Sequence, residues 1–366
     1  MAQAAPGDQL RFSALQLLQA VVEKGASDLH LTTGSPPLLR IDGNVFPLKL
    51  PPLKNVEVKQ LVYSILSEEQ KIRFEKANEL DFSFGVPNLS RFRGNCFVQR
   101  GSLAAVFRRI PHKVMSFDDL GLPPVIADIS KKPRGLCLVT GATGSGKSTT
   151  LASLIDKINS EQRVHILTIE DPIEFVHEHK LAIVNQREVG SDTAGYKESL
   201  KYALRQDPDV VLIGEMRDQE TISAALTIAE TGHLVFGTLH TNSAISSITR
   251  IIDVFPPHQQ QQIRVQLSMS LIGVMSQQLL PRATGSGRVL AMEIMVPNAA
   301  IRNLVREDKL HQVYSQMQVG QAGSGMQTMN QCLSGLLLRQ AITIEEAMLA
   351  SSDTDELRQI LQSHRR

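Results

Sequence analysis

The middle of the chain reads Gly141-Ala142-Thr143-Gly144-Ser145-Gly146-Lys147-Ser148-Thr149, which fits the pattern G-x-x-x-x-G-K-[ST]. The preceding segment, 135–140, is a short apolar run typical of a buried parallel strand. The following segment, 150–158, has apolar residues at helical spacing. A strand, a glycine loop and a helix in this order are the context of a phosphate-binding loop, so we expect the chain to bind a nucleoside triphosphate.

The residue types in this loop suit phosphate chemistry. Glycines let the backbone wrap closely, so that amide N–H groups and the helix N-terminus face negative charge. The ammonium of Lys147 would reach the β- and γ-phosphates of ATP, and the hydroxyl of Ser148 would ligate Mg²⁺. The residues that we expect to bind nucleotide are Gly141, Thr143, Gly144, Ser145, Gly146, Lys147, Ser148 and Thr149.

The composition of the chain limits its class and its partners. The length of 366 residues favours two domains, and 42% hydrophobic with 20% charged residues is ordinary for a globular protein. Lys plus Arg number 38 and Asp plus Glu 37, and aromatic residues are only 4%, so we expect no nucleic-acid partner. The sequence contains no signal-peptide pattern and no apolar run of membrane-spanning length. We therefore expect a cytoplasmic protein that reaches a membrane only through a partner.

The potential metal ligands are sparse. Cys96, Cys137 and Cys332 are far apart and form no C-x-x-C pair, which favours a reducing cytosol and disfavours a cysteine zinc site. His177 and His179 have the spacing to share one face of a strand, but no third ligand is placed by spacing, so metal binding there is disfavoured.

The order of predicted elements indicates an α/β chain of two domains. Residues 1–111 predict an α+β domain with a mainly antiparallel sheet, with helices at about 12–25, 54–66 and 67–77 and strands at 27–32, 38–41, 45–46, 80–84, 91–98 and 104–108. Residues 112–366 predict alternating strands and helices, which favours a parallel sheet with crossover helices. In that domain we expect a short helix near 123–130, strands at 136–140, 164–169, 209–213 and 233–238, helices at 147–160, 195–206 and 218–231, further strands near 277–281 and 288–296, and a helical region from about 298.

The segment Asp209-Val210-Val211-Leu212-Ile213-Gly214-Glu215 is an apolar strand that ends in an acid. Such a strand beside a phosphate-binding loop is the usual arrangement around Mg²⁺. Gly214 stands where many such strands carry an Asp ligand. We therefore expect Glu215 to hold the metal through its water shell, or to orient the attacking water.

Acids also follow the strand after the first helix, in Ile169-Glu170-Asp171-Pro172-Ile173-Glu174. Parallel sheets place ligands at the carboxyl ends of their strands, so one of these acids is a candidate general base for water. A helix cap or an acidic surface loop remains the alternative for each of them.

A fourth segment, 231–242, is an apolar strand that ends in His and Thr. We expect His240 to sense the γ-phosphate and to relay its loss. The same role is favoured less strongly for His233, because a His at a strand end is more often structural.

In this order and spacing, the four segments resemble the Walker A, Asp box, Walker B and His box of the secretion and type IV pilus motor ATPases. The resemblance extends from Ala26-Ser27-Asp28-Leu29-His30-Leu31 to a C-terminal segment that is similar to the A-I-R-N-L-I-R-E motif tied to pilus retraction, with Val305 in place of Ile. Its spacing predicts an amphipathic helix with Ile301, Leu304 and Val305 inward and two arginines on another face. The motif residues are Ala300, Ile301, Arg302, Asn303, Leu304, Val305, Arg306 and Glu307.

The resemblance implies a PAS-like N-terminal domain, a RecA-like P-loop ATPase core and a ring-shaped homohexamer with nucleotide between domains. It points to Glu174, ahead of Glu170, as the base and to Glu215 as the Mg²⁺-linked acid. It also implies that Arg93 and Arg108 reach the γ-phosphate, where guanidinium groups accelerate phosphoryl transfer. The alternative for these arginines is a cross-strand or surface charge.

The function implied is ATP hydrolysis that powers type IV pilus retraction, and with it twitching motility, from the cytoplasmic side of an inner-membrane platform protein. An assembly or secretion ATPase of the same family is disfavoured, because those relatives carry an additional N-terminal domain and usually a four-cysteine zinc insertion. An accessory retraction ATPase of the same kind stays open, both as an identity and as a partner. A nucleic-acid motor and a nucleotide-sensing scaffold are the more distant alternatives.

Overall fold

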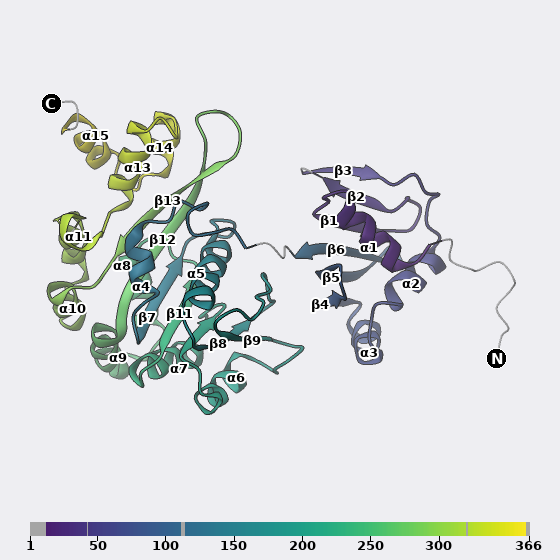
Figure 1. The fold of residues 1–366 in the computed structure, drawn as a ribbon, viewed down its shortest axis with the longest axis horizontal. Helices are drawn as coiled ribbons and strands as arrows, with labels where there is room; N and C mark the ends of the chain where they lie inside the picture. The colour runs from purple at the N-terminus through teal and green to yellow at the C-terminus, as the bar shows by residue number, and fades with distance from the viewer. Residues whose placement is uncertain (1–11, 42, 111–113, 320, 364–366) are drawn as a thin grey trace, which may run out of the picture. The chain divides into compact units, whose positions relative to one another are not determined.

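The computed structural model describes residues 12–41, 43–110, 114–319 and 321–363. The chain divides into two compact units, Met1–Lys113 and Val114–Arg366, called the N-terminal and C-terminal units below (Figure 1). The expected boundary between residues 111 and 112 lies outside the described residues.

The N-terminal unit contains a six-stranded sheet in the order β3-β2-β1-β6-β5-β4, and every neighbouring pair is antiparallel. This confirms the predicted antiparallel sheet. Its elements are α1 (Ala14–Glu23), β1 (Asp28–Leu31), β2 (Leu38–Ile41), β3 (Asn44–Pro47), α2 (Asn55–Tyr63), α3 (Glu68–Ala77), β4 (Glu79–Val86), β5 (Ser90–Gln99) and β6 (Ser102–Ile110).

Local sequence signals explain where the helices of this unit begin. The Ser13 hydroxyl accepts a hydrogen bond from the Gln16 amide, and the Gln16 side chain accepts one from the Ser13 amide in return, which forms a capping box at the start of α1. Ser67 and Gln70 form the same box at the start of α3. Both helices therefore start where their first free N–H groups find side-chain partners.

The C-terminal unit contains a seven-stranded mixed sheet in the order β13-β12-β7-β11-β10-β8-β9. The strands from β9 to β12 are parallel, and β13 returns antiparallel to β12. The parallel pairing predicted for β7, β8, β10 and β11 is confirmed, and β12 and β13 make the sheet mixed by forming an antiparallel hairpin at one edge. The strands are β7 (Gly135–Thr140), β8 (His165–Glu170), β9 (Ile183–Glu188), β10 (Val210–Ile213), β11 (Leu234–Leu239), β12 (Leu271–Pro281) and β13 (Arg288–Met295).

Helices cover both faces of this sheet. Alternate side chains of the central strands point to opposite sides, and the apolar side chains on each side pack against helices. Leu136 and Leu138 of β7 pack in one cluster with residues of α6 to α11, whereas Cys137 and Val139 pack in another with α4 and α5. No described helix is both long and apolar enough to span a membrane. The helices are α4 (Pro124–Ile129), α5 (Lys147–Glu161), α6 (Tyr196–Ala203), α7 (Gln219–Glu230), α8 (Ala244–Asp253), α9 (Pro257–Ser270), α10 (Ala299–Arg306), α11 (Val313–Val319), α12 (Gln321–Ser324), α13 (Met329–Leu338), α14 (Ile344–Ala350) and α15 (Thr354–Ser363), with short 3₁₀ turns at Leu204–Gln206 and Leu310–Gln312.

Strand β9 was not predicted. Its sequence, Ile183-Val184-Asn185-Gln186-Arg187-Glu188, is mostly polar and lacks the apolar run of a buried parallel strand. It forms because it pairs with β8 at the edge of the sheet, where Ile183 and Asn185 remain exposed. Edge position therefore explains why its hydrophobic pattern is weak.

Gly94 lies in the aromatic part of the N-terminal core, paired across strands with Phe82 and Phe107. A Cβ atom at this position would lie 2.6 Å from Cε1 of Phe82 and 3.2 Å from Cδ1 of Phe107. The Phe82 ring cannot easily retreat, because it stacks on Phe84 with ring centroids 5.6 Å apart. Close ring packing over this strand thus requires glycine.

Gly94→Ala should therefore destabilise the N-terminal unit by about 1–3 kcal/mol, the usual cost of overpacking a core. The measurement is calorimetric unfolding of the full chain, in which we expect a lower midpoint for this unit. The matched control is Gly85→Ala on β4, where an added Cβ meets nothing within 4 Å. Equal midpoints for the two variants would contradict this packing argument.

Candidate functional site

Four segments meet at one edge of the C-terminal sheet. The strands β7, β11, β10 and β8 are neighbours and run parallel, so the residues that follow their carboxyl ends lie along the same edge. The glycine loop follows β7, the acidic segment from Glu170 follows β8, Gly214 and Glu215 follow β10, and His240 follows β11. The structure thus brings together the segments that the sequence singled out.

The glycine loop has a backbone that only glycine accommodates easily. Gly141, Gly144 and Gly146 have φ angles of 142°, 81° and 91°. A Cβ on Gly141 would lie 2.4 Å from the backbone oxygen of Gln277 and 2.6 Å from the hydroxyl of Ser145. Helix α5 begins at Lys147 directly after the loop, so its N-terminal amides lie at this edge.

The ammonium of Lys147 rests on its own loop. It donates hydrogen bonds to the backbone oxygens of Gly141, at 2.7 Å, and Ala142, at 3.0 Å. Burial lowers the pKa of Lys147, and the negative charges of Glu215 and Glu174 act in the opposite direction. The charges of these two predicted acids thus favour the protonated form of Lys147.

Gln277 of β12 is a residue that sequence reasoning missed. Its side-chain amide donates a hydrogen bond of 2.9 Å to the backbone oxygen of Ser145, in the middle of the loop. One position before it, the hydroxyl of Ser276 lies 2.7 Å from that of Thr140 at the end of β7. A strand was expected near this position, but no sequence signal placed it beside β7.

Glu215 is held as an anion among hydrogen-bond donors. Its carboxylate lies 2.6 Å from the Nε of Arg217 and 3.2 Å from the Nε2 of His240. The hydrogen bond from Arg217, which outweighs the effect of burial, and the neighbouring positive charges hold the pKa of Glu215 below its ordinary value. Arg217 was also missed, although it lies only two positions after the predicted acid.

The structure gives a steric reason why position 214 is a glycine and not an Asp. A Cβ at this position would lie 2.8 Å from the hydroxyl of Tyr196 and 3.2 Å from the Cα of Glu170. The Thr238 hydroxyl donates a hydrogen bond to the Gly214 backbone oxygen and fixes it further. An Asp side chain has no room here, which leaves Glu215 as the acid that follows β10.

Tyr196, the first residue of α6, is a further member of the site that sequence reasoning missed. Burial raises the pKa of its phenol, and the nearby carboxylates of Asp171, Glu170 and Glu215 raise it further. The phenol therefore stays protonated. Its only sequence signal is an aromatic residue at the start of a predicted helix.

The two candidate bases differ in their surroundings. Glu170 accepts hydrogen bonds from the hydroxyl of Thr168, at 2.6 Å, and the side-chain amide of Gln186, at 3.2 Å. Burial raises its pKa. Glu174, in contrast, is an exposed residue in the loop after β8.

The loop between β8 and β9, residues 171–182, is called the Asp-box loop below. His177 and His179 lie in this loop, not on a strand, so the expectation that they share a strand face is wrong. Burial lowers the pKa of His177 to about 4, against the opposing effect of Asp156. Among the residues that the structure describes, no group of three His, Cys, Asp or Glu side chains is placed to hold a metal ion.

Three of the predicted site residues do not belong to this edge of the C-terminal sheet. His233 precedes the amino end of β11, at the opposite edge of the sheet, and its Nδ1 lies 3.0 Å from the backbone oxygen of Ile228. Arg93 and Arg108 belong to the N-terminal unit, where they are direct cross-strand neighbours on β5 and β6. The Nε of Arg108 donates a hydrogen bond of 2.8 Å to the carboxylate of Asp28.

The segment similar to the retraction motif forms α10, as predicted. Ile301 and Val305 are buried, and Leu304 packs partly buried against the same core. The guanidinium of Arg302 donates hydrogen bonds to the backbone oxygens of Ser268 and Met269 at the end of α9, at 2.7 and 3.0 Å. Burial lowers the pKa of Arg302, whereas Arg306 remains exposed.

Comparisons with known proteins place the chain in a family. Residues 9–291 match the family model described as Type II/IV secretion system protein. The chain is 54% identical over 332 residues to the type IV pilus retraction ATPase PilT of Pseudomonas aeruginosa, covering 91% of this chain and 96% of the relative. It is 46% identical over 348 residues to a twitching motility protein of Neisseria gonorrhoeae, covering 95% and 93%.

A solved structure is similar over the same range. The crystal structure of the pilus retraction motor PilT with bound ADP superposes with a TM-score of 0.90 at 53% identity, covering 95% of this chain and 100% of that chain. The chain therefore belongs to the type II/IV secretion system protein family and, within it, to the type IV pilus retraction ATPases.

Proposed function

We propose that this chain is a Mg²⁺-dependent ATPase motor that converts ATP hydrolysis into retraction of type IV pili, and so into twitching motility. One observation carries the proposal: the glycine loop with Lys147, the Glu215–His240 pair and the Asp-box loop with Glu174 converge at one sheet edge. Each supplies one requirement of phosphoryl transfer, namely phosphate binding, charge compensation and water activation.

The glycine loop and the first turn of α5 suit the phosphates of ATP. Backbone amides and the helix N-terminus face the edge, and the Lys147 ammonium is held beside them by carbonyl oxygens that a phosphate can replace. The hydroxyl of Ser148 and the ionised carboxylate of Glu215 are oxygen donors of the kind that Mg²⁺ prefers. When bound, Mg²⁺ would neutralise charge on the β- and γ-phosphate oxygens.

We assign water activation to Glu174. Glu170 already accepts two side-chain hydrogen bonds, which suits a residue that supports the loop. Glu174 is exposed in the loop that follows β8, and its negative charge favours the protonated form of Lys147. His240, hydrogen-bonded to Glu215, is placed to respond when the charge at the metal site changes.

We further propose that the chain forms a ring-shaped homohexamer. In this proposal residues 1–111 are a PAS-like N-terminal domain and residues 112–366 are a RecA-like core that binds the nucleotide. Arg93 and Arg108 of the PAS-like domain would reach that nucleotide. The hydrogen bond from Arg108 to Asp28 would fix the direction of that guanidinium. Domain movement would then pass to an inner-membrane platform protein from the cytoplasmic side, with an accessory retraction ATPase as a further partner. The exposed Arg306 of α10 is a candidate contact in that transmission.

Cells that lack this chain test the proposed function directly. We expect abundant surface pili that never shorten in recordings of labelled fibres, because assembly continues without a retraction motor. Cells without pili would instead favour an assembly ATPase. Normal shortening would contradict the proposal that this chain is the retraction motor.

Lys147→Ala should lower ATPase turnover by roughly 10²–10³-fold, the usual effect of removing one preorganised group that stabilises developing charge. The matched control is Lys157→Ala on the same helix, because that ammonium forms a surface ion pair with Glu161. The measurement is steady-state phosphate release. Turnover within a few-fold of wild type in Lys147→Ala would contradict the assigned phosphate site.

Gly214→Ala should lower both turnover and thermal stability, because the new methyl group would meet the Tyr196 hydroxyl. Adding Tyr196→Phe should restore part of both losses by removing the oxygen atom involved. Gly335→Ala in α13, where an added Cβ meets nothing within 4 Å, serves as the control for glycine replacement. Equal losses in the single and double variants would argue against this contact.

A further inference from the structure

Gln186 has no role in the function derived so far, yet it contacts the loop that carries the proposed base. It lies on β9, the edge strand that sequence analysis did not predict. We propose that Gln186 is a positioning residue, which holds the Asp-box loop so that the carboxylate of Glu174 points to the phosphate edge. The inference rests on the proposed role of Glu174.

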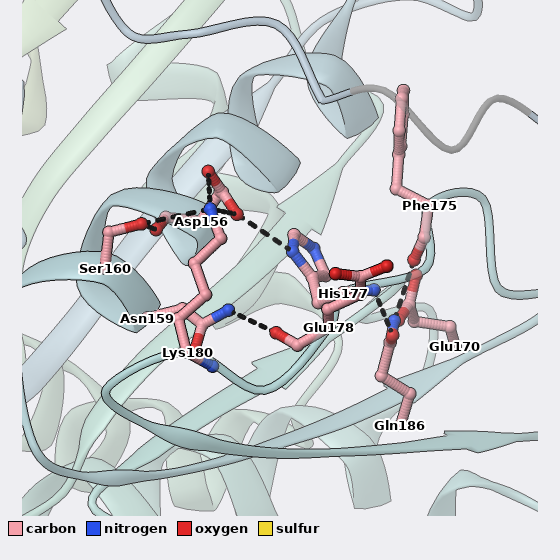
Figure 2. A network of polar contacts seen from close by, with 9 residues as sticks. All are labelled: Asp156, Asn159, Ser160, Glu170, Phe175, His177, Glu178, Lys180 and Gln186. Carbon is pink, nitrogen blue, oxygen red and sulfur yellow. Dashed lines mark hydrogen bonds and ion pairs between the residues drawn. The ribbon is translucent and has the colours of Figure 1, made fainter.

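The side chain of Gln186 makes three hydrogen bonds at once (Figure 2). Its amide nitrogen donates to the carboxylate of Glu170, at 3.2 Å, and to the backbone oxygen of Phe175, at 2.8 Å. Its amide oxygen accepts from the backbone N–H of His177, at 2.7 Å. A single amide group therefore ties together Glu170, the residue before the loop, and two loop residues after Glu174, namely Phe175 and His177.

Glu188, two positions further along β9, also holds the Asp-box loop. Its carboxylate accepts a hydrogen bond of 3.1 Å from the backbone N–H of Ile173, the residue just before Glu174. Alternate residues of a strand share one face, so Gln186 and Glu188 reach the loop from the same side. The backbone on both sides of Glu174 is thus fixed by β9, while its own side chain remains exposed.

The remainder of the Asp-box loop is held by a different element. Lys180 forms an ion pair of 2.6 Å with Asp156 of α5, and the side-chain amide of Asn159 donates to the backbone oxygen of Glu178, at 2.7 Å. Figure 2 shows these contacts on the α5 side and Gln186 on the other. Loss of Gln186 would therefore release Phe175 and His177, on the far side of Glu174, whereas Glu188 would still hold Ile173 and the contacts with α5 would keep the rest of the loop in place.

Gln186→Ala should lower kcat for ATP hydrolysis roughly 10- to 100-fold, because a displacement of about 1 Å in a catalytic group has effects of this size. The KM for ATP should change by less than roughly threefold, since no phosphate-binding group is touched. The control is Asn185→Ala on the same strand, whose amide bonds the ring of His165 at 2.9 Å, near the other end of β8. Turnover of that variant should stay near wild type.

Gln186→Glu supplies a readout that a purely structural role would not change. An ionised carboxylate can still accept from His177 but cannot donate to Phe175 or Glu170. Its protonated form donates again, and the neighbouring Glu170 raises the pKa of the introduced group. We therefore expect kcat of this variant, relative to wild type, to rise as the pH falls, with no such relative rise in Gln186→Ala.

Glu174→Gln in the same assay separates the two proposals. If Gln186 acts through Glu174, then Gln186→Ala should cause little further loss of kcat in the Glu174→Gln background. Wild-type turnover of Glu174→Gln would refute the assignment of the base. The positioning role would be overturned if Gln186→Ala kept wild-type kcat, or if the loss in the double variant were fully additive. It would also be overturned if Gln186→Ala lowered kcat, ATP affinity and melting temperature in parallel.

Discussion

Parallel pairing of β7, β11, β10 and β8 is the constraint on which the site depends. Parallel strands end at the same edge, so segments that are far apart in the chain must meet there. The central strand β7 is buried along its whole length, and helices on both faces fix the sheet. A sheet fixed in this way keeps the phosphate-binding and acidic groups at its edge preorganised, which is the main protein contribution to phosphoryl transfer.

Charge balance at this edge follows from close contacts. The carboxylate of Glu215 contacts Arg217 and His240, and the charges of Glu215 and Glu174 favour the protonated form of Lys147. Steric limits decide which acids take part, because the Tyr196 hydroxyl excludes a side chain at position 214. Glu215, one position later, is therefore the acid that follows β10, and the surrounding groups keep it ionised.

The sequence predicted the elements with strong local signals and failed where tertiary contacts decide. The glycine loop, its flanking strand and helix, and the antiparallel N-terminal sheet all have regular patterns or turn chemistry. Strand β9 does not, because an edge strand needs little hydrophobic surface. Gln277, Tyr196 and Gln186 carry no motif, and only pairing between distant strands or packing of α6 brings them to the site. Helical spacing placed Arg302 on another face than Ile301 and Val305, but it gave no sign of its contact with the end of α9.

The central claim is that this sheet edge binds and hydrolyses ATP with Lys147 as the phosphate contact. A crystal structure of the chain with Mg²⁺ and a non-hydrolysable ATP analogue tests it most directly. We predict that the Lys147 ammonium leaves the backbone oxygens of Gly141 and Ala142 for the γ-phosphate, with the metal between Ser148 and Glu215. A nucleotide bound elsewhere, or a Lys147 that stays on its own loop beside the phosphates, would contradict the account.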